Sequence, residues 1–169
     1  FHLPAPWDYR NPFGTTDGAE IAKRIAAQFE DEIAFQGADT IAAFIMEPIL
    51  GAGGVIPPHH SFMPGVAEIC RKNGILLIAD EVITAFGRTG AWTGSRLWGV
   101  KPDFSSTAKA ITNAYFPFGA LMIAGVVAFA GGFDPSASSG EYALGGRKFD
   151  FRVKPAFPKK LSREFLLVR

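Results

Sequence analysis

The chain has 169 residues, with 17 Lys and Arg against 16 Asp and Glu, a formal net charge of +1 and 48% hydrophobic residues. This composition predicts one domain of ordinary size, excludes a disordered and strongly charged chain, and gives no general reason to expect a nucleic-acid partner. The single cysteine excludes a disulfide framework and any Cys-x-x-Cys metal or redox site. The chain opens at Phe1 and its first methionine is Met46, so we expect a fragment. No basic segment followed by an apolar one precedes the first expected element, so we expect no secretory signal and a cytoplasmic location.

The first expected element is a helix over about residues 17–35. Asp17 and Glu20 form a D-x-x-E start signal, and apolar residues then recur every four positions. The apolar run 41–46 is too short for a typical helix and predicts a strand buried on both faces. A glycine-rich loop at 51–54 follows it.

A second helix and a second strand come next. Val66 and Ile69 share one face of a helix that Asn73 and Gly74 end. Residues 75–79 are fully apolar and predict another buried strand. A strand, a helix and a strand in this order predict a parallel pair with a right-handed crossover.

Short strands near residues 104–106 and 119–124 are expected to extend the same sheet. The fold class is therefore α/β, with a mainly parallel sheet and flanking helices. The uncharged stretch 110–133 contains Pro and several Gly, which favours core strands and turns over a membrane span.

The end of the chain differs in charge from the rest. After residue 139 there are eight of the 17 basic residues but only three of the 16 acidic ones. We therefore expect one domain over 1–124 and a divergent basic tail of uncertain structure over 125–169. Without a binding motif, a solvated tail is favoured over one that binds nucleic acid.

Ionisable residues follow three of the expected strands: Glu47, Asp80 and Lys109. Ligands of an open parallel sheet bind beyond the carboxyl ends of its strands. Asp80 follows five apolar residues, so its carboxylate is expected at the edge of a dry core. There it either pairs with a cation or strong hydrogen-bond donors, as in a binding site, or caps a turn. A lysine near an apolar crevice acts more readily as an amine nucleophile, whereas most lysines are solvated surface charges. Both alternatives stay open for each residue.

Other motifs carry less information. The glycine-rich loop has Ile56 at the sixth position, so it fails the dinucleotide fingerprint, and it lacks the Gly-Lys-Ser/Thr of a P-loop. His59 and His60 have no spaced acid or cysteine ligand, so we expect no metal site. Cys70 is expected to pack in the core, and no Gly-x-Ser-x-Gly sequence indicates a serine hydrolase.

Three stretches together form a more specific pattern. They are 44–49 (FIMEPI), 77–90 (LIADEVITAFGRTG) and 102–120, which contains Thr107-Ala108-Lys109. Their order and content resemble the class III (omega) aminotransferases, pyridoxal-phosphate enzymes of fold type I. The resemblance runs from about Tyr9 to Ala124 and implies a fragment of the large cofactor-binding domain, with intact family members as homodimers.

The resemblance also implies a role for each candidate residue. Lys109 resembles the lysine that forms a Schiff base with pyridoxal 5'-phosphate and then shuttles a proton. Asp80 resembles the carboxylate that pairs with the pyridine nitrogen, which keeps the ring protonated and able to accept electrons. Val82 resembles the residue that packs on the ring, and Glu47 the carboxylate that lines the pocket.

Glu81 and Arg88 are each expected to be a structural ion-pair group or a group that orders a loop. The family's phosphate cup, stacking aromatic residue, partner-subunit threonine and substrate-binding arginine have no match here, so we expect weak cofactor retention and little turnover. The implied reaction moves an amino group from an amine or omega-amino acid to a keto acid. The alternatives are an aminomutase on the same scaffold and a non-catalytic or unstable α/β fragment.

Overall fold

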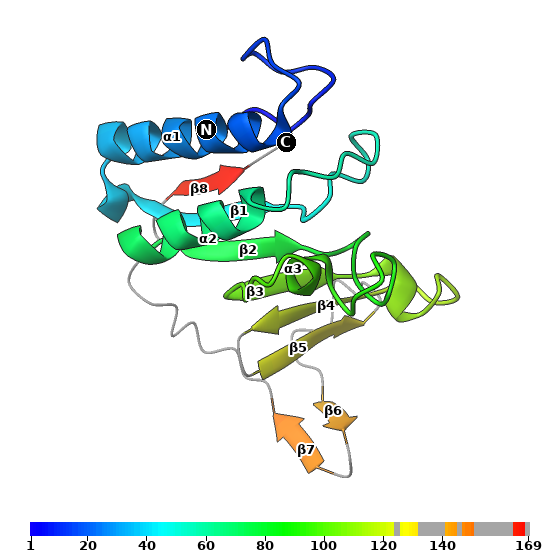
Figure 1. The fold of residues 1–169 in the computed structure, drawn as a ribbon. Coiled ribbons are helices and arrows are strands. Elements are labelled where there is room, and N and C mark those ends of the chain that lie inside the picture. The colour runs from blue at the N-terminus through cyan, green and yellow to red at the C-terminus, as the bar shows by residue number, and fades with distance from the viewer. Residues whose placement is uncertain (124–125, 132–140, 145–146, 151–163, 168–169) are drawn as a thin grey trace.

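A six-stranded sheet forms the centre of the molecule (Figure 1). The computed structural model describes residues 1–123, 126–131, 141–144, 147–150 and 164–167. In spatial order the strands are β5 (Val126–Gly131), β4 (Phe118–Ile123), β3 (Phe104–Thr107), β2 (Leu76–Asp80), β1 (Ile41–Met46) and β8 (Glu164–Leu167). A separate antiparallel pair consists of β6 (Glu141–Leu144) and β7 (Arg147–Asp150).

Four of the six strands are parallel. β8, β1, β2 and β3 run in one direction, whereas β4 pairs antiparallel with β3 and β5 antiparallel with β4. The mainly parallel α/β sheet predicted from the sequence is confirmed, as are the two short strands that extend it.

Two helices, α1 (Gly18–Gln36) and α2 (Phe62–Asn73), pack against each other over β1 and β2 (Figure 1). The apolar stripe of α1 is buried, and the ring of Phe29 lies 4.6 Å from the ring of Phe44 on β1, measured between centroids. Cys70 on α2 is part of the same core, so its predicted packing role is confirmed. Gly74 ends α2 in the left-handed conformation (φ 63°), which favours glycine at this position.

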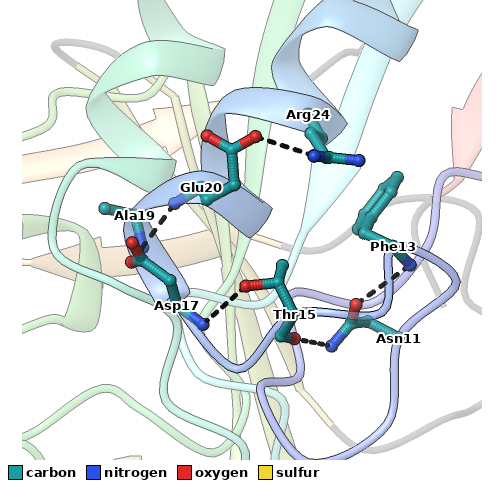
Figure 2. Close-up of polar contacts among 7 residues, drawn as sticks. All are labelled: Asn11, Phe13, Thr15, Asp17, Ala19, Glu20 and Arg24. Carbon is teal, nitrogen blue, oxygen red and sulfur yellow. Dashed lines mark hydrogen bonds and ion pairs between the residues drawn. The ribbon is translucent and has the colours of Figure 1, made fainter.

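Side-chain hydrogen bonds attach the entry segment to the start of α1 (Figure 2). The Asp17 carboxylate accepts bonds from two backbone N–H groups of the first turn, at 2.9 and 3.4 Å. Glu20 pairs with Arg24 at 2.8 Å. The Asp17 N–H donates to the Thr15 hydroxyl, and the Asn11 amide donates to the Thr15 carbonyl. The predicted helix start is therefore confirmed within one residue.

The described part of the uncharged stretch includes β4 and β5, as predicted, but β4 is less buried than expected. Within β4 only Ala120 is buried, and Leu121 is 40% exposed. No helix in the described part of the chain is long and apolar enough to cross a membrane. The predicted tail 125–169 falls largely outside the described residues, so its separation from residues 1–124 stays a prediction.

Candidate active site

The strand register brings the candidate residues to one edge of the sheet. Met46 pairs with Ala79, and Asp80 pairs with Ser106 on β3. Because β1, β2 and β3 are parallel, their carboxyl ends meet at the same edge. Glu47 directly follows β1, Asp80 ends β2, and Lys109 comes two residues after β3.

Asp80 is half-buried, and one of its two carboxylate oxygens is held by protein donors. Oδ1 accepts hydrogen bonds from the Ser106 hydroxyl at 3.2 Å and from the Val82 backbone N–H at 3.1 Å. Oδ2 accepts no hydrogen bond from any described residue. The carboxylate is thus oriented through one oxygen, while the other can accept a hydrogen bond from a ligand.

Glu81, the next residue, is fully buried and has a different environment. Its carboxylate accepts hydrogen bonds from the Thr84 hydroxyl, from the backbone N–H groups of Gly94 and Ser95, each at 2.7 Å, and from the Ser95 hydroxyl at 2.6 Å. Its own N–H donates to the Ser106 carbonyl at 2.8 Å. Glu81 therefore joins the end of β2 to the start of α3 (Gly94–Leu97) and orders the intervening loop, which is one of the two roles expected of it.

Arg88 lies in this loop and is exposed. It forms no ion pair with another residue of the described ranges, so an ion-pair role for Arg88 is not found there. The loop turns back at Phe86, whose N–H donates to the Trp92 carbonyl at 2.7 Å. Glu81 is satisfied by uncharged donors instead, which sequence inspection did not identify.

Glu47 orders the glycine-rich loop after β1. Its Oε2 accepts a hydrogen bond from the Gly51 N–H at 2.8 Å. Paired backbone bonds between Leu50 and Ile56, at 3.1 and 2.8 Å, close the loop. The N–H groups of Gly54 and Val55 donate to the Gly51 carbonyl. Five N–H groups of residues 50–56 are thus used within the loop, which agrees with the absence of a dinucleotide fingerprint in its sequence.

Lys109 is exposed and has an unusual backbone conformation. It begins a short 3-10 helix (Lys109–Ile111) with φ of 48°, in the left-handed region that residues other than glycine seldom adopt. Asn113 and Ala114 also have positive φ, and the Ala114 N–H donates to the Lys109 carbonyl at 3.0 Å. Strained backbone of this kind is typical of functional sites and carries no signal in the sequence.

The residues at this edge have complementary chemistry. A primary amine can condense with a carbonyl carbon, and a carboxylate oxygen without a protein partner can accept a bond from a protonated ring nitrogen. Asp80 and half-buried Val82 are in direct contact through the Val82 N–H. Glu47 and Lys109 are brought to the same edge by the register.

Known families and relatives match the greater part of the chain. The family model for class-III aminotransferases matches residues 2–132, which begins before Tyr9 and ends beyond Ala124, the limits of the resemblance in the sequence. Gamma-aminobutyrate transaminase 1, mitochondrial, of Oryza sativa subsp. japonica is 47% identical over 133 residues, which are 73% of this chain and 25% of the relative. The Solanum lycopersicum protein of the same name is 44% identical over 133 residues, with the same two shares.

Solved structures agree with this assignment. An amine transaminase from an uncultivated Pseudomonas species, solved in its PLP-bound form, is 50% identical with a TM-score of 0.70, over 72% of this chain and 27% of that one. An (S)-enantioselective omega-transaminase from Thermomicrobium roseum is 47% identical with a TM-score of 0.69, over 73% and 27%. The Pseudomonas jessenii omega transaminase, solved in complex with PMP, is 41% identical with a TM-score of 0.70, over 73% and 27%.

The chain spans about a quarter of the length of the curated relatives that it matches. Family match, sequence identity and fold all point to the same group of enzymes, for which pyridoxal phosphate is the cofactor. The chain belongs to the class III aminotransferase family.

Proposed function

We propose that this chain supplies the part of an aminotransferase active site that binds the pyridine ring and aldehyde of pyridoxal phosphate, with Lys109 as the point of covalent attachment. The reaction would transfer an amino group from an amine or omega-amino acid to a keto acid. The observation that carries this proposal is the Asp80 carboxylate, fixed through Oδ1 with Oδ2 left without a described partner, at the edge where β3 leads to Lys109.

These residues fit the cofactor chemically. Bound pyridoxal phosphate supplies a ring that accepts electrons from the carbon bearing the amino group. Asp80 Oδ2 would hold the proton on the ring nitrogen, because a carboxylate at this position favours the charged ring. Val82, two residues after Asp80, would pack on the ring, and Glu47 would line the pocket beside it.

Lys109 would perform the proton transfer as well as the attachment. Its Nζ would hold the cofactor by condensing with the aldehyde, with loss of water, and as a free amine it would be the base that holds and returns the proton of the substrate carbon. The positive φ of Lys109 supports a functional site at this position, because strained backbone clusters at such sites.

Reduction of the complex tests the attachment point. The chain is incubated with pyridoxal phosphate, reduced with borohydride, digested, and mapped by mass. We expect the pyridoxyl mass on the Lys109 peptide, its loss in Lys109→Ala, and its retention in Lys101→Ala, which removes another exposed lysine just before β3. A label elsewhere, or none, would contradict the proposal.

A non-catalytic role is the second candidate, and exposed aromatic side chains favour it. Tyr115 is 92% exposed and Phe116 56% exposed, on the segment that follows Lys109. Apolar surface of this kind favours association or aggregation of the isolated chain. Circular dichroism with gel filtration separates the two: a cooperative monomer or dimer supports the enzyme, and aggregates without cofactor binding support the alternative.

The remaining assignments rest on the family alone. Small amines and keto acids as substrates, and a homodimer of the intact protein, are part of the proposal. An aminomutase on the same scaffold is distinguished by substrate profiling. A cytoplasmic location stays a prediction, since several relatives carry the word mitochondrial in their names.

A further inference from the structure

We infer that Ser106 is a positioning residue for the proposed cofactor site: its hydroxyl fixes the Asp80 carboxylate so that Oδ2 faces the ring nitrogen. This inference rests on the proposed function. It adds a residue from β3 to the set Asp80, Val82, Glu47 and Lys109.

The contact follows from the sheet register. Asp80 and Ser106 are direct partners on adjacent parallel strands, so their side chains project from the same face of the sheet. The Ser106 Oγ lies 3.2 Å from Asp80 Oδ1. An ionised carboxylate can only accept, so the serine hydroxyl is the donor.

The two donors to Asp80 Oδ1 differ in origin. The Val82 N–H belongs to the backbone that continues from Asp80 itself, so this bond moves with the end of β2. Among the described residues, Ser106 is the one donor to Asp80 from another strand. That strand, β3, leads directly to Lys109. The Ser106–Asp80 bond therefore sets the position of the ring-nitrogen partner relative to the reactive amine.

Neighbouring hydroxyl residues on β3 do not share this role. Ser105 is buried and points to the opposite face, because side chains alternate along a strand. The Thr107 hydroxyl donates to the Ala120 carbonyl on β4 at 3.2 Å. Of three consecutive hydroxyl side chains, only Ser106 contacts Asp80 in the described structure. Ser105→Ala is thus a matched control on the same strand.

The test compares affinity for two probes, measured by absorbance titration of the 169-residue chain. One is pyridoxal phosphate, and the other is its analogue with carbon in place of the ring nitrogen. We expect Ser106→Ala to weaken pyridoxal phosphate binding about tenfold, the effect of losing a donor to a charged group. Ser106→Thr keeps the donor and should stay within about twofold of the unaltered chain, as should Ser105→Ala. For the carbon analogue, the unaltered chain and Ser106→Ala should bind equally.

Several outcomes would overturn the inference. An equal loss of affinity for both probes would mean that Ser106 acts only on the fold. No loss in Ser106→Ala, with weakened binding in Asp80→Asn, would remove the role of Ser106 and leave the proposed function intact. Failure of the unaltered chain to bind pyridoxal phosphate would overturn both. If Ser106→Ala does not fold, Ser106→Thr is compared with the isosteric Ser106→Val, and equal affinities would refute the role.

Discussion

Replacing Glu81 with alanine should remove most of the stability of the folded chain. The Glu81 carboxylate is fully buried and accepts four hydrogen bonds, two on each oxygen. The donors on Thr84, Gly94 and Ser95 are themselves in buried residues. Glu81→Ala leaves these donors without an acceptor, and each buried donor left unpaired costs about 1–3 kcal/mol.

The four losses share one site and do not add fully. We therefore expect Glu81→Ala to lower the free energy of unfolding by about 4–6 kcal/mol, which is close to the whole stability of many domains. Glu81→Gln retains one acceptor oxygen but turns an amide N–H₂ toward the other donors, so a loss of about 2–3 kcal/mol is expected. Glu68→Ala, on the exposed face of α2, is the control and should change stability by less than about 0.5 kcal/mol.

Urea unfolding, monitored by circular dichroism, measures these differences in free energy. Hydrogen exchange shows which part of the chain loses protection. In the unaltered chain the N–H groups of Gly94 and Ser95 should exchange slowly, because the Glu81 carboxylate accepts from both. In Glu81→Gln these two N–H groups should lose protection before those of β1. If Glu81→Ala unfolds within about 1 kcal/mol of the unaltered chain, or keeps protection at Gly94, the buried carboxylate does not organise this loop.

Further predictions concern packing and the buried thiol. Gly94→Ala should destabilise the chain by about 1–3 kcal/mol in urea unfolding, since an added Cβ would lie 2.7 Å from the Pro48 Cβ. Gly65→Ala, inside α2 with nothing within 4 Å of the added Cβ, should instead stabilise it, by about 0.5–1 kcal/mol; the same sign for both would contradict this account. Burial, with a smaller effect of Asp103, raises the pKa of Cys70 from 9.0 to about 12. The thiol should therefore resist iodoacetamide at pH 8.5 until urea unfolds the chain, and rapid alkylation of the native chain would contradict the burial. Because the folded pKa lies above the unfolded one, the stability that this thiol contributes is complete below pH 9 and is lost as the pH rises toward 12, a loss that Cys70→Ala should not show.

Local signals account for the elements that were predicted well. The four-residue spacing after Asp17 requires one buried helical face, and Gly74 can end α2 in a conformation that other residues avoid. The apolar run at β1 is buried on both faces, as predicted, whereas β2 is buried on one face and half-buried on the other. Each signal acts within about one turn or one strand of its own residues, so the bounds could be set without knowledge of the tertiary structure.

Contacts between distant segments could not be predicted in this way. Gly94 and Ser95 reach Glu81 across 13 and 14 residues through a loop with no repeating pattern. Ser106 reaches Asp80 across 26 residues, and the contact depends on a register in which a shift of one residue would turn Ser106 to the other face. An ion-pair role for Glu81 was expected from its charge, although uncharged donors satisfy this carboxylate.

Asp80 and Glu81 show why adjacent carboxylates at the end of one strand have different roles. A carboxylate offers about four lone-pair sites. The donors on Glu81 occupy two on each oxygen, so Glu81 has no capacity left for a ligand. Both donors to Asp80 converge on Oδ1, so the charge is held in place while Oδ2 stays available. The count of donors on each oxygen, which the sequence does not contain, therefore gives Glu81 a structural role and supports the proposed cofactor-binding role of Asp80.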